Sequence, residues 1–249
     1  MIFIKVKFLG TGYCGFQYQK NGVSVQQVLC EAAMALFGGE CAITGCSRTD
    51  AGVHANMFCC TLNDENAPNK VPVSAIPEAM NHFLPGDIAV YEASLVDLSF
   101  HPRYDAKEKE YIYRIWNSKL RDPFYEGRAY QYKPTIDIEK MNLAAKMFVG
   151  THDFTSFSAA DKSRKSSDNV RTVFDCSAEK TNEEDLVVIK IRGNGFLYNM
   201  VRIIAGTLLC VSEGKISPED ISSIILARDR KKAGPTAPAC GLYLNKVIY

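Results

Sequence analysis

Residues 41–62, CAITGCSRTDAGVHANMFCCTL, place a short polar turn between two apolar stretches. The stretches at 41–46 and 53–62 have strand lengths and strand composition, so the pattern predicts strand, tight turn, strand. Arg48 and Asp50 lie in that turn. A carboxylate on a rigid turn can act as a nucleophile or a base. Asp-Ala-Gly is also ordinary turn chemistry, because Asp bonds its own backbone and Gly tolerates positive φ.

The flanking segments place this hairpin inside a larger unit. Residues 2–8 alternate like a strand, and Ser24 and Gln27 form a capping box for a helix that ends at Gly38. A second helix is expected at 75–83 and a further strand at 88–95. The order β-α-β-β-α-β is that of the ferredoxin-like split unit.

The second half repeats this order. Its expected segments are a strand at 111–117, an extra strand at 128–132, a helix capped by Asp137, strands at 172–179 and 186–193, a long helix at 197–212, a short helix after Ser217 and a last strand at 242–248. The sequence therefore predicts an α+β protein of two tandem ferredoxin-like halves. Their mixed, mainly antiparallel sheets would pack around a central cleft, a common place for ligands. The expected domains are 1–105 and 106–249.

Bulk properties exclude several classes of protein. The 249 residues are 47% hydrophobic and 23% charged, which is ordinary for a globular protein. No apolar run has the length of a membrane span, and residues 1–8 do not resemble a signal peptide. The nine cysteines show no paired framework, so we expect reduced thiols and a cytoplasmic location.

The distribution of charge says more than the net charge of +1. Residues 103–133 hold eight Lys or Arg against five Asp or Glu, with aromatic residues between them. Further basic clusters lie at 162–165 and 228–232, the first inside a long polar loop expected at 151–171. Basic residues with aromatics are typical of a surface that contacts RNA. A solvated face over core aromatics has the same composition.

Two other patterns are candidates for a nucleotide-binding motif and a metal site, and neither candidate is supported. Residues 10–15, GTGYCG, match the dinucleotide motif G-x-G-x-x-G, but the next helix begins only after Ser24, which argues against a nucleotide cofactor. The four histidines have no metal-ligand spacing.

Several motifs together resemble the TruA-type tRNA pseudouridine synthases. The segment RTDAGVH at 48–54 is similar to the catalytic signature of that family, and GTGYCGFQ at 10–17 is similar to its glycine-rich motif. The other matching segments are FHPRYDA at 100–106, KEYIY at 109–113, GTHDFTSF at 150–157, VRT at 170–172, FLYNMVR at 196–202 and PACGL at 238–242. Leu9 departs from the pattern, since the family usually has an acidic residue there.

The resemblance implies an isomerase that converts uridine to pseudouridine at positions 38, 39 and 40 of the tRNA anticodon arm. It also implies tRNA as the partner, a homodimer, and neither cofactor nor metal. Under it Asp50 is the catalytic nucleophile, and Arg48 assists in flipping the target nucleotide out of the RNA stack.

The resemblance also assigns Tyr111 to stack on the displaced uracil and Arg202 to lie beside the catalytic aspartate. Phe157 and the basic residues of the 162–171 loop are expected along the RNA path. Tyr113 shares a strand face with Tyr111, so the two assignments can be exchanged.

Two alternatives remain open on the sequence. A ferredoxin-like RNA-binding module without chemistry would not need Asp50. A nucleotide-dependent oxidoreductase would use the glycines at 10–15.

Overall fold

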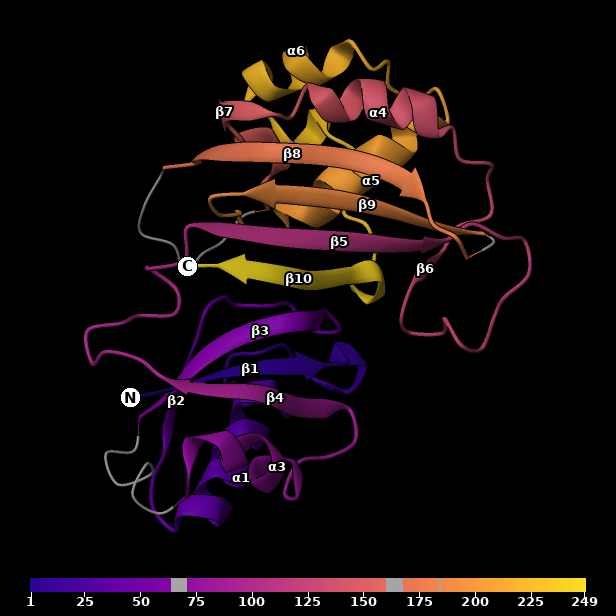
Figure 1. The fold of residues 1–249 in the computed structure, drawn as a ribbon. Coiled ribbons are helices and arrows are strands. Elements are labelled where there is room, and N and C mark those ends of the chain that lie inside the picture. Colours follow the sequence, from indigo (N-terminus) through magenta and orange to yellow (C-terminus); the bar gives the residue numbers. More distant parts are fainter. Residues whose placement is uncertain (64–70, 160–167, 184) are drawn as a thin grey trace. The chain divides into compact units, whose positions relative to one another are not determined.

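The structure is a computed structural model that describes residues 1–63, 71–159, 168–183 and 185–249 (Figure 1). The basic cluster at 162–165 lies outside these residues. The chain divides into two compact units. Unit 1 comprises Met1–Lys107 and Tyr243–Tyr249, and unit 2 comprises Glu108–Leu242.

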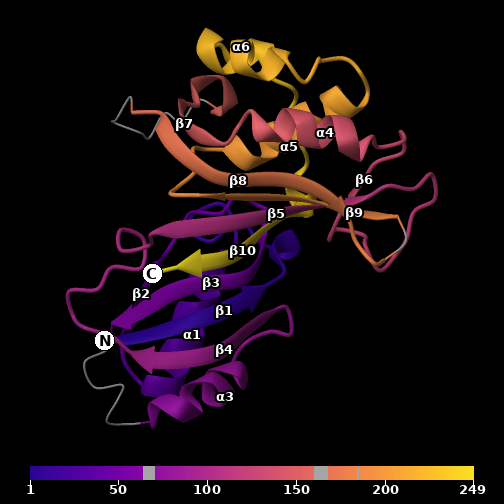
Figure 2. The same ribbon diagram turned by 45° about the horizontal axis from the view of Figure 1, so that its top comes forward.

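Unit 1 is a sheet with helices on one face. Its elements are β1 (Ile2–Phe8), η1 (Gly10–Gly12), α1 (Val25–Phe37), β2 (Ala42–Gly45), β3 (His54–Asn63), η2 (Val73–Ala75), α3 (Ile76–Asn81), β4 (Ile88–Leu95) and β10 (Leu242–Ile248). β1 pairs antiparallel with both β3 and β4, and β2 pairs antiparallel with β3. The strand order β4-β1-β3-β2, with helices after β1 and β3, is that of the predicted split unit. α1 and α3 lie together on one face of the sheet (Figures 1 and 2).

The last strand groups with the first unit. Tyr243 and Leu244 of β10 pair in parallel with His54 and Ala55 of β3. The sequence places residues 243–249 in the second domain because they follow it along the chain. Their clustering with unit 1 is set by this parallel pairing, a tertiary contact between segments far apart in sequence.

Unit 2 has its own strands and helices. Its elements are β5 (Glu108–Trp116), β6 (Tyr130–Gln131), α4 (Ile138–Lys146), β7 (Gly150–Asp153), η3 (Thr155–Phe157), β8 (Val170–Lys180), β9 (Leu186–Gly193), α5 (Met200–Ser212), α6 (Asp220–Ala227), η4 (Arg230–Lys232) and η5 (Ala239–Gly241). The strand order is β5-β9-β8-β7, and these neighbours are antiparallel. β6 adds a short parallel pairing to β5.

Local sequence signals explain where several helices begin. The Ser24 hydroxyl accepts a hydrogen bond from the backbone N–H of Gln27 at 3.1 Å, and the Asp137 carboxylate accepts one from Lys140 at 3.0 Å. Each bond satisfies an N–H that the helix itself leaves without a partner. Gly38 ends α1 in the left-handed region at φ +72°. The class predicted from sequence, a mixed α+β fold, is confirmed.

β7 was not expected, and it occupies the start of the segment predicted as a loop at 151–171. The four residues of β7 pair with β8 between Gly150–Val173 and Asp153–Val170. This short polar strand has no apolar alternation to reveal it, so its existence depends on the neighbouring strand.

Candidate active site

The turn that carries Asp50 is closed by its own backbone. The carbonyl of Asp50 accepts a hydrogen bond from the N–H of Val53 at 3.2 Å, and Gly52 has φ +80°. A glycine with positive φ at the third position is what a type II turn requires. Because the turn lies between β2 and β3, the half-buried Asp50 is presented at the end of a hairpin.

The glycine-rich segment after β1 packs directly on this turn. A Cβ added at Gly10 would meet the carbonyl oxygen of Val53 at 1.9 Å, and one at Gly15 would meet that of Thr49 at 2.4 Å. The N–H of Phe16 donates to the Thr49 carbonyl at 3.3 Å. These glycines therefore allow backbone to lie against backbone, which no side chain would permit. They support the turn, and the first α-helix of the chain, α1, begins only at Val25, well after the last of these glycines.

A buried histidine ties the two segments together. The His54 ring is 0% exposed, and its Nδ1 accepts a hydrogen bond from the Gly10 N–H at 2.9 Å. The ring also stacks on Tyr243 at a centroid distance of 4.5 Å. Its position is that of a structural residue that fixes the glycine segment against the start of β3. The hydroxyl of the neighbouring Thr49 is buried without a hydrogen-bond partner.

The far end of the glycine segment is anchored as well. The Tyr13 hydroxyl donates to the Asp87 carboxylate at 2.6 Å. Burial, and then this contact with Asp87, raises the pKa of Tyr13 above its ordinary value. A phenol that stays protonated keeps its donor role at neutral pH, so the bond persists there.

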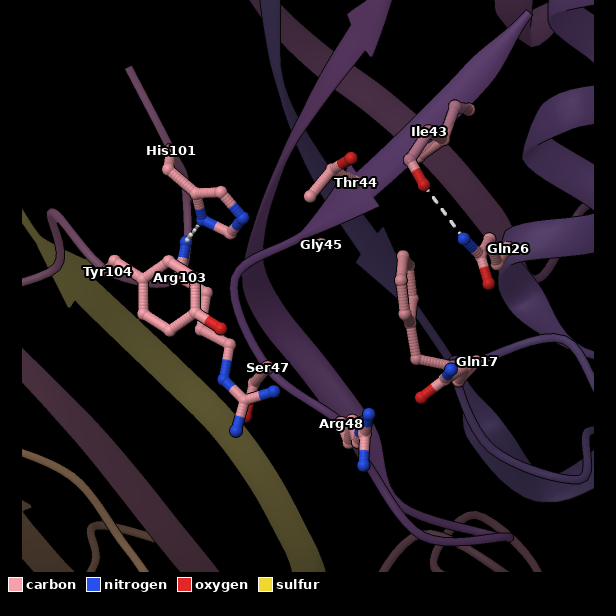
Figure 3. A pocket seen from close by; sticks show the side chains of 11 residues that line it. Gln17, Gln26, Ile43, Thr44, Gly45, Ser47, Arg48, His101, Arg103 and Tyr104 are labelled. Carbon is pink, nitrogen blue, oxygen red and sulfur yellow. Dashed lines mark hydrogen bonds between the residues drawn. The ribbon is translucent and has the colours of Figure 1, made fainter. Parts of the chain in front are cut away.

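Arg48 lies on the surface beside an open pocket of about 210 Å³. Figure 3 shows its guanidinium on the same wall as Gln17, across from residues of the 101–104 segment. An exposed guanidinium can bind phosphate and can stack on a base. Arg48 therefore stays a candidate for the substrate contact expected from sequence.

The two tyrosines of β5 can be told apart by their surroundings. Tyr113 is 0% exposed, and its hydroxyl donates to the Pro238 carbonyl at 2.8 Å. Burial raises the pKa of Tyr113 well above its ordinary value. Tyr111 is 7% exposed and packs edge-on against Phe196 at 5.2 Å. Tyr113 is thus a core residue, and Tyr111 remains the candidate for contact with a base.

Arg202 is held at the start of α5 by its side chain. Its Nε donates to the Ala237 carbonyl at 2.8 Å, and its Nη1 donates to the Asn199 carboxamide oxygen at 2.8 Å. The Ala237 N–H donates back to the Arg202 carbonyl at 3.1 Å. Two donors on a planar group fix the plane of the guanidinium.

Phe157 corrects one expectation. The side chain is 0% exposed and packs edge-on against Phe148 at 5.0 Å and Phe154 at 6.3 Å. A ring without exposed surface has no face that RNA could reach, so Phe157 belongs to the core of unit 2. The sequence could not distinguish these roles, because an aromatic residue suits both.

The residues that the structure describes contain no group of three or more His, Cys, Asp or Glu able to hold a metal ion. None of the nine cysteines, which all lie in the described ranges, forms a disulfide bond. Burial raises the pKa of Cys59 to about 12, with the nearby Cys46 adding to the shift. A thiol with such a pKa is protonated at neutral pH and a poor nucleophile. No helix within the described ranges is both long and apolar enough to cross a membrane.

Comparison with known proteins identifies the family. A model of the family "tRNA pseudouridine synthase" matches residues 4–105 and 144–249. This chain belongs to the tRNA pseudouridine synthase family. Members of this family are isomerases that act on tRNA. The segments at 48–54 and 10–17 lie within the matched residues.

Several relatives cover nearly the whole chain. A protein named tRNA pseudouridine synthase A from Thermoanaerobacter sp. (strain X514) is 45% identical over 248 residues, covering 100% of this chain and 99% of its own. Proteins of the same name are 42% identical in Caldicellulosiruptor bescii (100% and 99% covered) and 40% identical in Clostridium acetobutylicum (99% and 98% covered). A solved Cbf5-Nop10-Gar1 complex gives a TM-score of 0.38 at 11% identity, covering 98% of this chain and 48% of that one.

Proposed function

We propose that this protein converts uridine to pseudouridine at positions 38, 39 and 40 of the tRNA anticodon arm, with Asp50 as the reacting carboxylate. The observation that carries the proposal is the turn at 49–53, in which main-chain contacts with Gly10 and Gly15 fix the segment that presents Asp50. A site built on rigid elements holds a reacting group within a narrow range of positions. The protein is proposed to work in the cytoplasm as a homodimer, without metal or cofactor.

The reaction suits one anchored carboxylate. The C1′–N1 bond of uridine breaks, the uracil turns, and a C1′–C5 bond forms. The C5 proton leaves to solvent and N1 takes up a proton from solvent, so that substrate and product are isomers. Asp50 attacks the sugar or removes a ribose proton, and either route holds one fragment while the base rotates. Glycosidases use an Asp or Glu for a related covalent step.

The target uridine is paired or stacked in the anticodon arm and must leave the stack. Extrusion of a base costs a few kcal/mol. Arg48, exposed and next to the pocket, is proposed to occupy the vacated space and bind the backbone phosphate. Its planar cation supplies both stacking and charge, which lysine in its place would not.

Tyr111 and Arg202 are the other two residues proposed to act in the reaction. Tyr111 is proposed to stack on the displaced uracil through the small part of its side chain that is exposed, 7%. Arg202 is proposed as the cation that balances the charge of the reacting carboxylate when the bound base excludes water.

Tritium release tests the proposal. Wild-type protein is incubated with anticodon-arm tRNA that carries 5-³H-uridine, and the modified positions are mapped by chemical labelling. Release of tritium with labelling at 38, 39 and 40 supports the proposal. Binding of tRNA without release identifies an RNA-binding module, and labelling at other positions contradicts the assignment to the anticodon arm. Sedimentation of the protein at micromolar concentration tests the homodimer.

A further inference from the structure

The pocket beside Arg48 has a lining that suits part of an RNA chain. Its walls come from the segment before α1, from the first turn of α1, from β2 and the residues after it, and from the turn at 101–104. The lining residues are Phe16, Gln17, Gln26, Ile43, Thr44, Gly45, Ser47, Arg48, His101, Arg103 and Tyr104 (Figure 3). Among these described residues two are arginines and none is acidic. A concave site with positive charge and polar groups attracts an anion.

The turn that supplies His101, Arg103 and Tyr104 is well ordered by its own bonds. The N–H groups of Tyr104 and Asp105 donate to the His101 carbonyl at 3.2 and 3.0 Å, and the Asp105 carboxylate accepts the N–H of His101 at 2.8 Å. The Arg103 N–H donates to Nδ1 of His101 at 3.1 Å. The last bond requires the neutral His101 ring to carry its proton on Nε2, where the proton is a hydrogen-bond donor.

The same turn exposes an aromatic surface. Tyr104 is 75% exposed, its ring lies 4.3 Å from that of His101, and the Arg103 guanidinium carbon lies 5.9 Å from its centroid. An exposed tyrosine has no place in a core, and nucleic-acid bases stack on such rings. Aromatic and cationic groups are therefore available side by side.

On the opposite wall of the pocket, the polar atoms of Gln26 already have hydrogen-bond partners within the protein. The Gln26 amide donates to the Ile43 carbonyl at 2.7 Å and accepts the Tyr18 N–H at 2.8 Å, so its polar atoms maintain the wall. Phe16 stacks on Phe58 at 4.1 Å and forms an apolar floor. The pocket is smaller than the roughly 300 Å³ at which drug-sized sites begin, so it suits one nucleotide unit rather than a longer segment.

We infer that this pocket binds one nucleotide of the tRNA next to the target uridine, with its phosphate between Arg48 and Arg103 and its base against Tyr104. The inference rests on the proposed function and adds a substrate contact in the 101–104 turn. Binding here would anchor the strand on one side of the extruded nucleotide, so that extrusion moves the uridine rather than the whole loop.

The test separates charge from stacking. Equilibrium binding of an unmodified tRNA transcript is measured at several KCl concentrations for wild type, Arg103→Ala, Tyr104→Ala and Tyr104→Phe. Lys146→Ala, which removes an exposed cation from α4 and no part of the pocket, is the charge-matched control. Because Arg103 and Tyr104 are on the surface, thermal melting should show that these variants remain folded.

Each variant has a distinct expected result. Arg103→Ala weakens binding about 5- to 30-fold and reduces the slope of log affinity against log salt by about 0.7–0.9, the value of one phosphate contact. Tyr104→Ala weakens binding about 5- to 100-fold with an unchanged slope, because stacking carries no charge. Tyr104→Phe and Lys146→Ala stay within about twofold of wild type.

The inference is overturned if Arg103→Ala and Tyr104→Ala bind as Lys146→Ala does. In that case tritium release by the wild-type protein would leave the proposed function standing. Absence of tritium release from wild type would instead remove the proposed function, whatever the binding results. In the variants, the expected change is a raised KM for tRNA with kcat within about threefold of wild type, since the contact positions substrate and does not touch the reacting atoms.

Discussion

In unit 1 the turn that carries Asp50 lies against a glycine-rich segment, and in unit 2 the helix that carries Arg202 lies against residues 234–237. Both contacts are too close for side chains. An added Cβ would meet the Val53 carbonyl oxygen at 1.9 Å from Gly10, and the Pro235 carbonyl oxygen at 1.9 Å from Gly206. The two units thus use glycine in the same way beside their candidate functional residues.

The two units differ in which part of the functional residue is held in place, the main chain or the side chain. In unit 1 the contacts made by Gly10 and Gly15 set the course of the main chain around Asp50. In unit 2 two hydrogen bonds fix the Arg202 side chain itself. A short aspartate needs only a rigid backbone to be placed, whereas a long arginine with several rotatable bonds also needs its head group held.

The largest structural effect is expected from Gly10→Ala. The new methyl group has only backbone to push against, so the turn at Asp50 must shift. Overpacking of this kind costs about 3 kcal/mol, which lowers Tm by about 6–12 °C in a chain of this size. Turnover should fall at least tenfold, because a small displacement of a reacting group is costly. Gly12→Ala is the control, since a Cβ there meets nothing within 4 Å; equal behaviour of the two variants would contradict this account.

Arg202→Ala should harm stability and turnover together. It removes two hydrogen bonds from a charged donor, each contributing about 1.5–3 kcal/mol, and leaves the Ala237 carbonyl without this partner. Arg202→Lys restores the charge without the planar fork and should recover only part of kcat. Melting curves and tritium-release rates measure both effects. An Arg202→Ala protein with wild-type kcat would remove this residue from the mechanism.

The two tyrosines of β5 should respond in opposite ways to Tyr→Phe. Tyr113→Phe removes the bond to the Pro238 carbonyl and should cost about 1–2 kcal/mol with little change in kcat. Tyr111→Phe should leave Tm near wild type and lower kcat, because we propose that the Tyr111 hydroxyl takes part in moving the C5 proton. Measuring Tm and kcat for both variants checks the assignment, and a reversed pattern would exchange their roles.

The smallest effects are expected at the helix caps. Ser24→Ala and Asp137→Ala each remove one capping bond, at a cost of about 1 kcal/mol. Tm should fall by about 2–4 °C in each case while kcat stays unchanged. Thermal melts beside activity assays provide the measurement. A loss of turnover in either variant would show that the caps support the site and not only the helices.

The sequence predicted local features better than contacts. β1 and β4 occur at the predicted residues, and the caps at Ser24 and Asp137 are confirmed, because each depends on neighbours in the chain. The start of the long helix was predicted three residues early. It begins at Met200 because Asn199 adopts a left-handed conformation with φ 60°.

The features that the sequence did not predict depend on contacts between residues far apart along the chain. The burial of Phe157, the short strand β7 and the grouping of residues 243–249 with unit 1 are set by tertiary packing. The sequence argued against a nucleotide site at residues 10–15, but the contact of Gly10 with Val53 could not be foreseen. Of the candidate site, Asp50 and Arg48 stay predictions from a sequence motif, whereas the main-chain contacts of Gly10 and Gly15 that support the turn are visible only in the structure.

The central claim is that Asp50 performs the chemistry while other residues bind and support. Its most direct test is a single-turnover measurement with Asp50→Asn, an isosteric change, at saturating tRNA, with affinity measured in parallel. The account predicts that tritium release is abolished while the dissociation constant for tRNA stays within about threefold of wild type. Tritium release at the wild-type rate from the variant would contradict it.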